Sequence, residues 1–153
     1  MRSPVVELET IIDADVDAVW RALTMPELIK KYLFGAEVIT DWEVGHPITF
    51  RGEWNGKPFT DRGEIRTIDP GHELSYTHWS ELEGESSAPQ HQQLVRYRLA
   101  SQGALTKLTL AQFNMGGSEP DEKKREEYRR NWKAMLDGLR ETVEAGAAAT
   151  SRH

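Results

Sequence analysis

The chain has 153 residues, of which 38% are hydrophobic and 29% charged, a composition typical of a globular protein. It contains no cysteine, which excludes disulfides, thiolate metal sites and cysteine catalysis, and its formal charge of −6 argues against a nucleic-acid or anionic-membrane surface. Acids interrupt the N-terminal residues where a signal peptide would be apolar, and no apolar run approaches a membrane span. We therefore expect a cytoplasmic protein with one domain over 1–145 and a disordered tail over 146–153.

The first part of the chain predicts one strand followed by two short helices. β-Branched residues alternate with acids over Val5–Ile12, as in a half-buried strand. Asp13 and Asp15 both offer caps for a helix that follows, and Thr24 begins a second helix with a capping box, which ends near Tyr32. Two short helices after one strand predict a compact corner and not a βαβ crossover.

The middle of the chain predicts six strands joined by turns. Apolar and polar residues alternate over Ile48–Trp54, and the following Asn55-Gly56 indicates a hairpin, because both central residues of a type I′ turn need positive φ. Asp69-Pro70-Gly71 and Ser101-Gln102-Gly103 indicate further turns. The expected strands are 37–42, 48–54, 57–68, 72–79, 92–100 and 104–113.

A long amphipathic helix is predicted over Ser118–Ala145, with Ser118 as its N-cap. Its apolar positions recur every three or four residues and form one stripe of Tyr128, Trp132, Met135, Leu136, Leu139 and Val143. So wide a stripe needs a large apolar surface opposite it, which a curved antiparallel sheet can supply. These elements predict an α+β fold in which a curved sheet and one helix enclose a cavity.

Three stretches resemble the SRPBCC superfamily, and within it the homologues of the heat-shock-protein-90 ATPase activator: VDAVWRALTMPELIKKYLFG, GEWNGKPFTDRGEIRTIDPGHELSYTHW and NWKAMLDGLRETVE. The resemblance covers about Val5–Glu144 and implies the helix-grip fold of START proteins and the birch-pollen allergen. In that fold a curved seven-stranded antiparallel sheet wraps around the C-terminal helix, with two short helices between the first and second strands and a deep cavity. Superfamily members bind sterols, lipids or polyketides, and a few catalyse cyclisation or dehydration. Many relatives carry glycine where this chain has Asn131.

The sequence shows no catalytic motif. Gly116-Gly117 lacks the spacing of a phosphate-binding loop, and no serine lies in a nucleophile elbow. His72, His78 and His91 are the only clustered imidazoles, and they lack the spacing of metal ligands. We therefore expect no metal and no cofactor, and the sequence favours binding over catalysis.

His78 has two interpretations. It shares a strand face with Leu74 and Tyr76, so it is either a residue near a strand end, bonded to a neighbour or to water, or a polar anchor that faces a ligand. Within the second interpretation it could also act as a general base. Asp61 and Glu64 lie on opposite faces of one strand and cannot form an acid–base pair with each other.

We therefore predict that an apolar or amphipathic small molecule, lipid-, sterol- or polyketide-like, binds between the sheet and the C-terminal helix. The alternatives are a co-chaperone-like module that stimulates a heat-shock-protein-90-type ATPase, and a cyclase- or dehydratase-like enzyme with the same cavity. The candidate partners are the ligand, a chaperone and a second copy of the chain, the last if Trp42 or Trp79 is exposed. The expected ligand-binding residues are Ile48, Phe50, Trp54, Leu74, Tyr76, His78, Tyr97, Leu108, Leu110, Gln112, Trp132, Met135 and Leu139.

Overall fold

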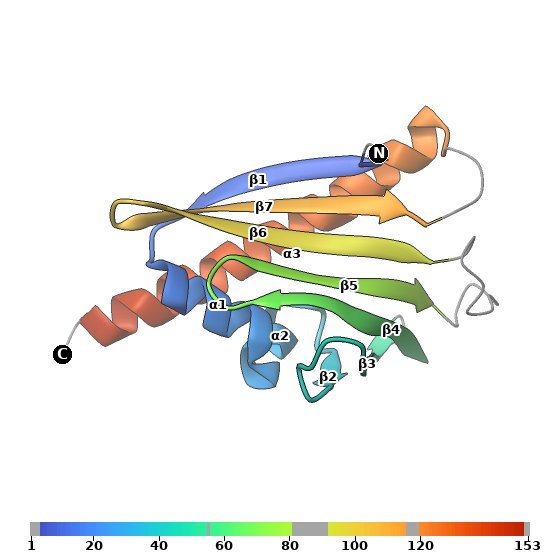
Figure 1. Cartoon of the computed structure of the whole chain (residues 1–153), viewed down its shortest axis with the longest axis horizontal. Helices are drawn as coiled ribbons and strands as arrows, with labels where there is room; N and C mark the ends of the chain where they lie inside the picture. Colours follow the sequence, from blue (N-terminus) through green and yellow to red (C-terminus); the bar gives the residue numbers. More distant parts are fainter. Residues whose placement is uncertain (1–3, 55, 81–91, 116–119, 152–153) are drawn as a thin grey trace.

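The computed structural model of the chain describes residues 4–54, 56–80, 92–115 and 120–151. A curved sheet of seven antiparallel strands wraps around one long helix (Figure 1), which confirms the predicted helix-grip fold. The elements in chain order are β1 Val6–Ile12, α1 Val16–Thr24, α2 Pro26–Tyr32, β2 Glu37–Ile39, β3 Pro47–Trp54, β4 Lys57–Asp69, β5 Glu73–Ser80, β6 Gln93–Gln102, β7 Leu105–Asn114 and α3 Glu122–Ser151.

The strands follow the order β1-β7-β6-β5-β4-β3-β2 across the sheet. From β2 to β7 each strand pairs with its neighbour in sequence, whereas β1 pairs with β7, with Val6 opposite Gln112. The tight connection between β3 and β4 sets Trp54 opposite Lys57, and Gly56 has a φ of 79°. This is the positive φ that the predicted two-residue hairpin requires, and glycine adopts it without a steric penalty.

The two short helices begin in different ways. Asp15 caps α1 as predicted, because its Oδ1 accepts a hydrogen bond from a backbone N–H of the first turn at 2.9 Å. The capping box predicted at Thr24 is wrong: Thr24 Oγ1 donates back to the Trp20 carbonyl at 2.9 Å. Helix α2 instead follows Met25, whose side chain makes no cap, and Pro26 supplies a φ that already suits a helix.

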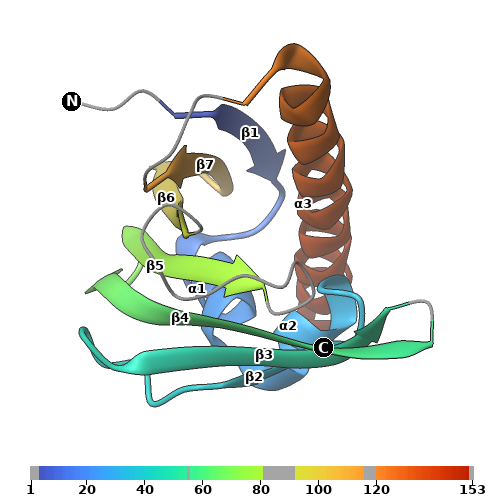
Figure 2. The ribbon, with the colours of Figure 1, turned by 90° about the vertical axis from the view of Figure 1, so that its right-hand side faces the viewer.

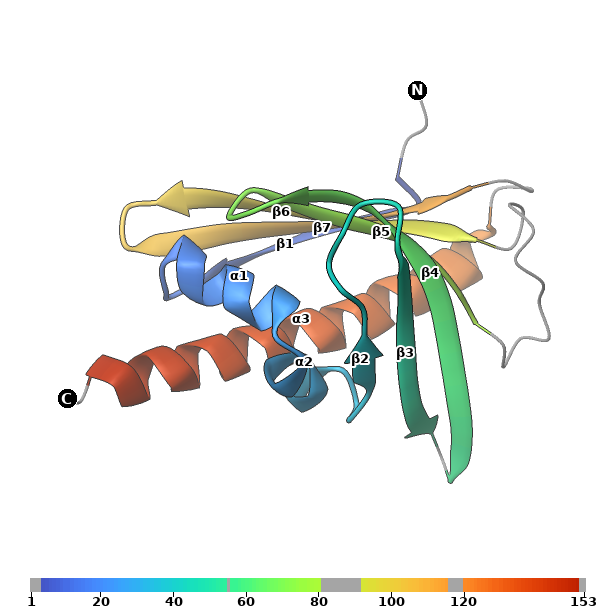
Figure 3. The same ribbon diagram turned by 60° about the horizontal axis from the view of Figure 1, so that its bottom comes forward.

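Helix α3 crosses the concave face of the sheet (Figure 3). Its first turn is capped by Asp121, whose Oδ1 accepts from the Lys124 N–H at 2.8 Å, and the predicted cap Ser118 lies outside the described residues. The sequence predicts a helix end at Ala145 and a disordered tail beyond it, whereas the structure continues the helix to Ser151. This added stretch is rich in alanine, which has the highest helix propensity of all residues.

The hydrophobic core lies between the concave face of the sheet and α3, with α1 and α2 closing one end (Figure 2). The two helices α2 and α3 approach closely at Gly138, where a Cβ would lie only 3.3 Å from the Tyr32 Cβ. The Tyr32 hydroxyl donates to the Ala22 carbonyl at 2.8 Å and so links α2 to α1. Four residues of the predicted apolar stripe on α3 are buried: Met135, Leu136, Leu139 and Val143.

The segment after β2 departs from the predicted strand 37–42. β2 ends at Ile39, and Trp42 has a φ of 61°, in the left-handed region that a bulky side chain rarely adopts. Its indole packs against the core, which holds this backbone conformation in place. Trp42 and Trp79 are both half-buried, so neither forms the exposed aromatic patch that would indicate a dimer. No helix among the described residues is long and apolar enough to cross a bilayer.

Candidate ligand-binding site

A cavity of about 290 Å³ opens between the concave face of the sheet and the N-terminal half of α3. Its lining residues come from the connection after α2, from strands β3 to β7 and from α3. Its apolar walls are Leu33, Phe34, Ala36, Phe50, Phe59 and Met135. The remaining lining side chains carry polar atoms: Asp61, Tyr76, His78, Gln93, Gln112, Tyr128, Asn131 and Trp132.

A second space of about 20 Å³ lies deeper, against α1 and α2. Trp42, Tyr76, Tyr97 and Met135 are among its lining residues. Since a cavity needs about 10–15 Å³ to hold one water, this space accommodates no more than about one solvent molecule. Of these two spaces beneath α3, the larger is therefore the candidate ligand site.

The structure divides the predicted binding residues into three groups. Six of them line the larger cavity: Phe50, Tyr76, His78, Gln112, Trp132 and Met135. Ile48, Leu74 and Tyr97 line only the small inner space. Leu108, Leu110 and Leu139 are fully buried and line neither, and the Trp54 side chain lies outside the described residues. The sequence pattern therefore identified which residues face inward, and it did not separate the cavity walls from the solid core.

Several wall residues were not singled out from the sequence. Phe34 lies in the connection between α2 and β2, and Phe59 and Asp61 lie on β4. Phe59 and Asp61 share one strand face with the buried Ile65, so alternation along β4 was the signal that could have found them. Asn131, an exposed residue on α3, also lines the cavity.

Tyr76 and Tyr97 form a hydrogen-bonded pair inside the core. Their hydroxyl oxygens are 3.1 Å apart, and both residues are buried. Burial raises the pKa of Tyr97 to about 12. Burial, with a further contribution from Tyr97, raises the pKa of Tyr76 well above its ordinary value. Both phenols therefore stay protonated at neutral pH, and one hydroxyl donates to the other.

Asp61 and His78 pair across β4 and β5 in the cavity wall. His78 Nε2 lies 2.9 Å from Asp61 Oδ2, and the two side chains are 26% and 18% exposed. The Phe50 ring meets the His78 ring edge to face at 6.0 Å between centroids. His78 is thus bonded to a neighbour and lines the cavity as well. The other carboxylate oxygen, Asp61 Oδ1, is buried and has no hydrogen-bond partner.

Gln112 and Trp132 connect the sheet to the covering helix. The Trp132 Nε1–H donates to Gln112 Oε1 at 2.6 Å, and Gln112 is fully buried. The Gln112 amide nitrogen donates to Asn114 Oδ1 at 3.4 Å. Both ends of the buried amide are therefore satisfied, and the indole ring is fixed at the cavity wall.

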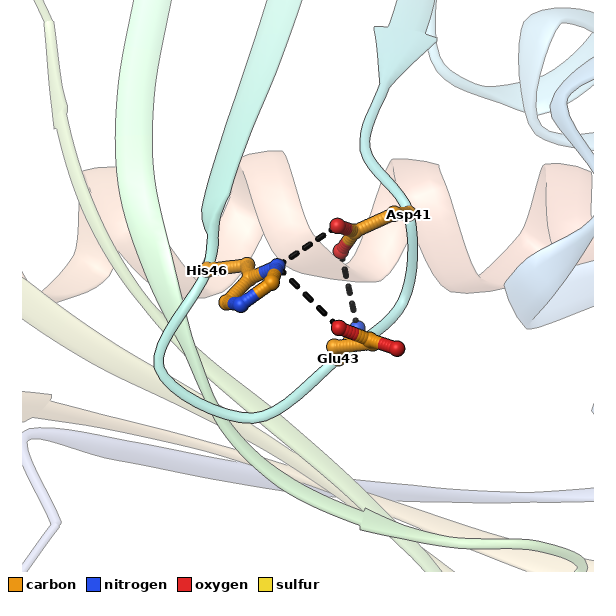
Figure 4. Close-up of side chains that lie close together, drawn as sticks. All are labelled: Asp41, Glu43 and His46. Atoms are coloured by element: carbon orange, nitrogen blue, oxygen red, sulfur yellow. Dashed lines mark hydrogen bonds and ion pairs between the residues drawn. The ribbon is translucent and has the colours of Figure 1, made fainter.

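A second polar cluster lies in the turn between β2 and β3, away from the cavity (Figure 4). Its members are the exposed Asp41, Glu43 and His46, whose ligand-type atoms lie within 4.8 Å of one another. His46 Nδ1 is 2.5 Å from Asp41 Oδ2 and 3.3 Å from Glu43 Oε2. The hydrogen bond and the negative charge of Asp41 raise the pKa of His46, and the same bond lowers the pKa of Asp41. Internal pairing thus accounts for the cluster, which stabilises the turn.

Comparison with known proteins identifies the family. A family model described as Activator of Hsp90 ATPase homolog 1-like protein matches residues 13–144, and no curated protein matches the sequence. A Cytophaga hutchinsonii protein with a solution structure is 33% identical, with a TM-score of 0.78 over 94% of this chain and 95% of that chain.

Two more distant structures share the fold. A Mesorhizobium loti protein is 24% identical, with a TM-score of 0.72 over 92% of this chain and 96% of that chain. CalU16 of Micromonospora echinospora is 23% identical, with a TM-score of 0.68 over 95% of this chain and 80% of that chain. The family model covers most of the elements that enclose the cavity. The chain therefore belongs to the family of Activator of Hsp90 ATPase homolog 1-like proteins.

Proposed function

We propose that the chain binds a small apolar or amphipathic molecule in the cavity between the sheet and α3. The observation that carries this proposal is a space of about 290 Å³ with mainly apolar walls and a few convergent polar side chains. This combination is typical of small-molecule sites, because the apolar walls supply affinity and the polar groups fix orientation.

The size of the cavity narrows the ligand class. Pockets for drug-sized ligands span about 300–1,000 Å³, so this one lies at the small end of the range. The flanking rings of Phe50, Phe59 and Trp132 favour a flat ligand. Among lipid-, sterol- and polyketide-like molecules, these features support a compact aromatic ligand of one or two fused rings over a sterol or a long acyl chain.

Native mass spectrometry of the freshly purified protein tests the proposal first. A stoichiometric added mass that is released on denaturation supports it and gives the ligand class. The ligand-free protein is then titrated with naphthylmethanol, followed by calorimetry and by thermal unfolding. A free probe concentration of 100 times its Kd is expected to raise the free energy of unfolding by about 2.7 kcal/mol. An absence of both binding and stabilisation would contradict the proposal.

Two tryptophan substitutions on α3 provide a matched pair of variants. Asn131→Trp fills the cavity mouth, whereas Ala134→Trp adds the same ring at an exposed position that does not line the cavity. Asn131→Trp is expected to weaken naphthylmethanol binding at least about tenfold, a loss of about 1.4 kcal/mol, and Ala134→Trp is expected to leave it unchanged. Equal Kd values for the two variants would show that naphthylmethanol does not bind in this cavity.

Family membership supports a second candidate function, the stimulation of an Hsp90-type ATPase. The apolar side chains of Phe34, Ile39 and Val44 are 54%, 42% and 60% exposed, as residues at a protein contact often are. The test is the ATPase rate of purified Hsp90 with increasing amounts of the chain. A concentration-dependent rise that Asn131→Trp leaves intact and Val44→Asp removes would support this function, and an unchanged rate would exclude it.

A further inference from the structure

Among the described residues that line the cavity, Asp61 has a buried side-chain oxygen with no hydrogen-bond partner. Asp61 binds His78 Nε2 through Oδ2 at 2.9 Å, while its Oδ1 is buried without a partner. A buried carboxylate oxygen without a donor is unfavourable, because it has lost water and gained nothing in exchange. Because Asp61 lines the cavity, a ligand in the cavity can donate to its carboxylate.

The histidine beside it adds a second acceptor. A carboxylate only accepts hydrogen bonds, so His78 Nε2 carries the proton of this bond, and in a neutral imidazole the other ring nitrogen carries none. Nδ1 is then an acceptor, and it has no hydrogen-bond partner among the described residues. The two atoms of the pair that lack a partner, Asp61 Oδ1 and His78 Nδ1, are therefore both acceptors. A ligand that bonds to this pair must supply a hydrogen-bond donor.

The other buried polar side chains of the cavity already have hydrogen-bond partners among the described residues. The Tyr76 hydroxyl is bonded to that of Tyr97, and the Gln112 side chain is bonded to Trp132 and Asn114. None of the described lining residues is a lysine or an arginine. A ligand carboxylate would therefore lose its hydration, meet the negative charge of Asp61 and find no lysine or arginine to compensate.

We propose that the cavity selects compact apolar ligands that carry a single hydrogen-bond donor, a hydroxyl or a protonated amine, directed at the Asp61 carboxylate, and that it rejects carboxylic acids. This inference rests on the proposed function, since it names the ligand class of the same cavity. Asp61 and His78 set the polarity of the accepted ligand, and the aromatic walls set its shape.

Four probes with one ring system test this selectivity on the intact protein: naphthylmethanol, naphthylmethylamine, methylnaphthalene and naphthoic acid. A hydrogen bond to a charged group corresponds to a change in Kd of at least about tenfold. The alcohol and the amine are therefore expected to bind at least about tenfold more tightly than methylnaphthalene, and naphthoic acid is expected to bind most weakly. The ratio between alcohol and amine tells whether a neutral or a charged donor is preferred.

The variant Asp61→Asn sharpens the comparison. Its amide oxygen can still accept from His78, which directs the NH₂ group, a donor, toward the position of Oδ1. The amine is expected to bind this variant about tenfold more weakly than the parent protein, and naphthoic acid is expected to bind it more tightly. Glu64→Gln is the matched control, because it removes one negative charge from the same strand at an exposed position outside the cavity.

The outcomes separate this inference from the proposed function. If all four probes bind with similar Kd values, or naphthoic acid binds as tightly as the amine, the selectivity is overturned while ligand binding stands. If no probe binds, the proposed function itself fails. The comparison among probes on the unmodified protein needs no variant, so it decides the question even if Asp61→Asn does not fold.

Discussion

At the scale of single residues, the paired phenols of Tyr76 and Tyr97 are coupled in their effect on stability. Each hydroxyl is the other's hydrogen-bond partner at 3.1 Å inside the core. Tyr76→Phe leaves the Tyr97 hydroxyl buried without a partner, which is expected to cost about 1–3 kcal/mol in the free energy of unfolding. Tyr97→Phe is expected to cost a similar amount.

The double variant with phenylalanine at both positions provides the control. Because it removes both polar groups together, its loss in the free energy of unfolding is expected to be smaller than the sum of the losses of the two single variants. Urea unfolding of the four proteins measures the coupling. Strict additivity would show that the two hydroxyls do not depend on each other.

The Asp41–His46 pair predicts a pH dependence of stability. The pKa of His46 is raised from 6.5, so its contribution is complete below pH 6.5 and is lost as the pH rises through the higher folded value. The pKa of Asp41 is lowered from 3.8, so its contribution is present above pH 3.8 and is lost on acidification. The stabilisation is therefore greatest between about pH 4 and 6.5.

Thermal unfolding across this pH range checks the prediction. The difference in Tm between the parent protein and His46→Asn is expected to be small, because the pair is exposed, and to shrink as the pH rises above the folded pKa of His46. In an Asp41→Asn background the same substitution is expected to lose its pH-dependent effect. A constant difference from pH 4 to 9 would exclude the ion pair as its cause.

At the scale of elements, the Trp132–Gln112 hydrogen bond holds α3 against β7 beside the cavity. Trp132→Phe keeps an aromatic ring but removes the donor that satisfies the fully buried Gln112 Oε1 at 2.6 Å. The variant is expected to lose about 1–3 kcal/mol of stability. Adding Gln112→Met in that background is expected to recover part of the loss, since the unsatisfied oxygen is then absent. Urea denaturation of the three proteins measures both effects.

Gly63 permits β4 and β5 to approach where they carry the Asp61–His78 pair. A Cβ at this position would lie 1.7 Å from the Thr77 carbonyl oxygen, a backbone atom that cannot rotate away. Gly63→Ala is expected to cost at least about 1–3 kcal/mol and to lower probe affinity, because the strands must separate. At Gly52 the nearest atoms belong to the Phe59 side chain, at 2.7 Å, so Gly52→Ala should unfold at a higher urea concentration than Gly63→Ala.

The elements themselves were largely predictable, because their signals are local. Alternation located the strands, Asn55-Gly56 located the tight hairpin, and Asp15 identified a helix start. The capping box predicted at Thr24 was wrong because the Thr24 hydroxyl donates instead to a carbonyl of the preceding turn. The Asp61–His78 pair could not be read from alternation alone. It depends on the register of β4 against β5, which shifts between Ile65 and Thr67.

At the scale of the whole molecule, the cavity arises from the angle between the helix and the sheet, which no local pattern encodes. Leu139 and Met135 belong to the same apolar stripe, and Leu110 and Gln112 to the same strand face. Yet Met135 and Gln112 line the cavity, whereas Leu139 and Leu110 pack in the solid core. The sequence pattern therefore predicts which of these residues face inward. It does not predict which of them line the cavity and which pack in the solid core.

The pairing of β1 with β7 also constrains the order in which the molecule assembles. The hairpins between β3 and β7 join neighbouring segments, whereas Val6 and Gln112 lie about 100 residues apart in the chain. Non-local pairings of this kind are slow to form, typically over milliseconds to seconds. Helix α3 can cover the concave face only after β7 has formed part of it. We therefore expect the cavity wall to be among the last surfaces of the folding chain to be shielded from water.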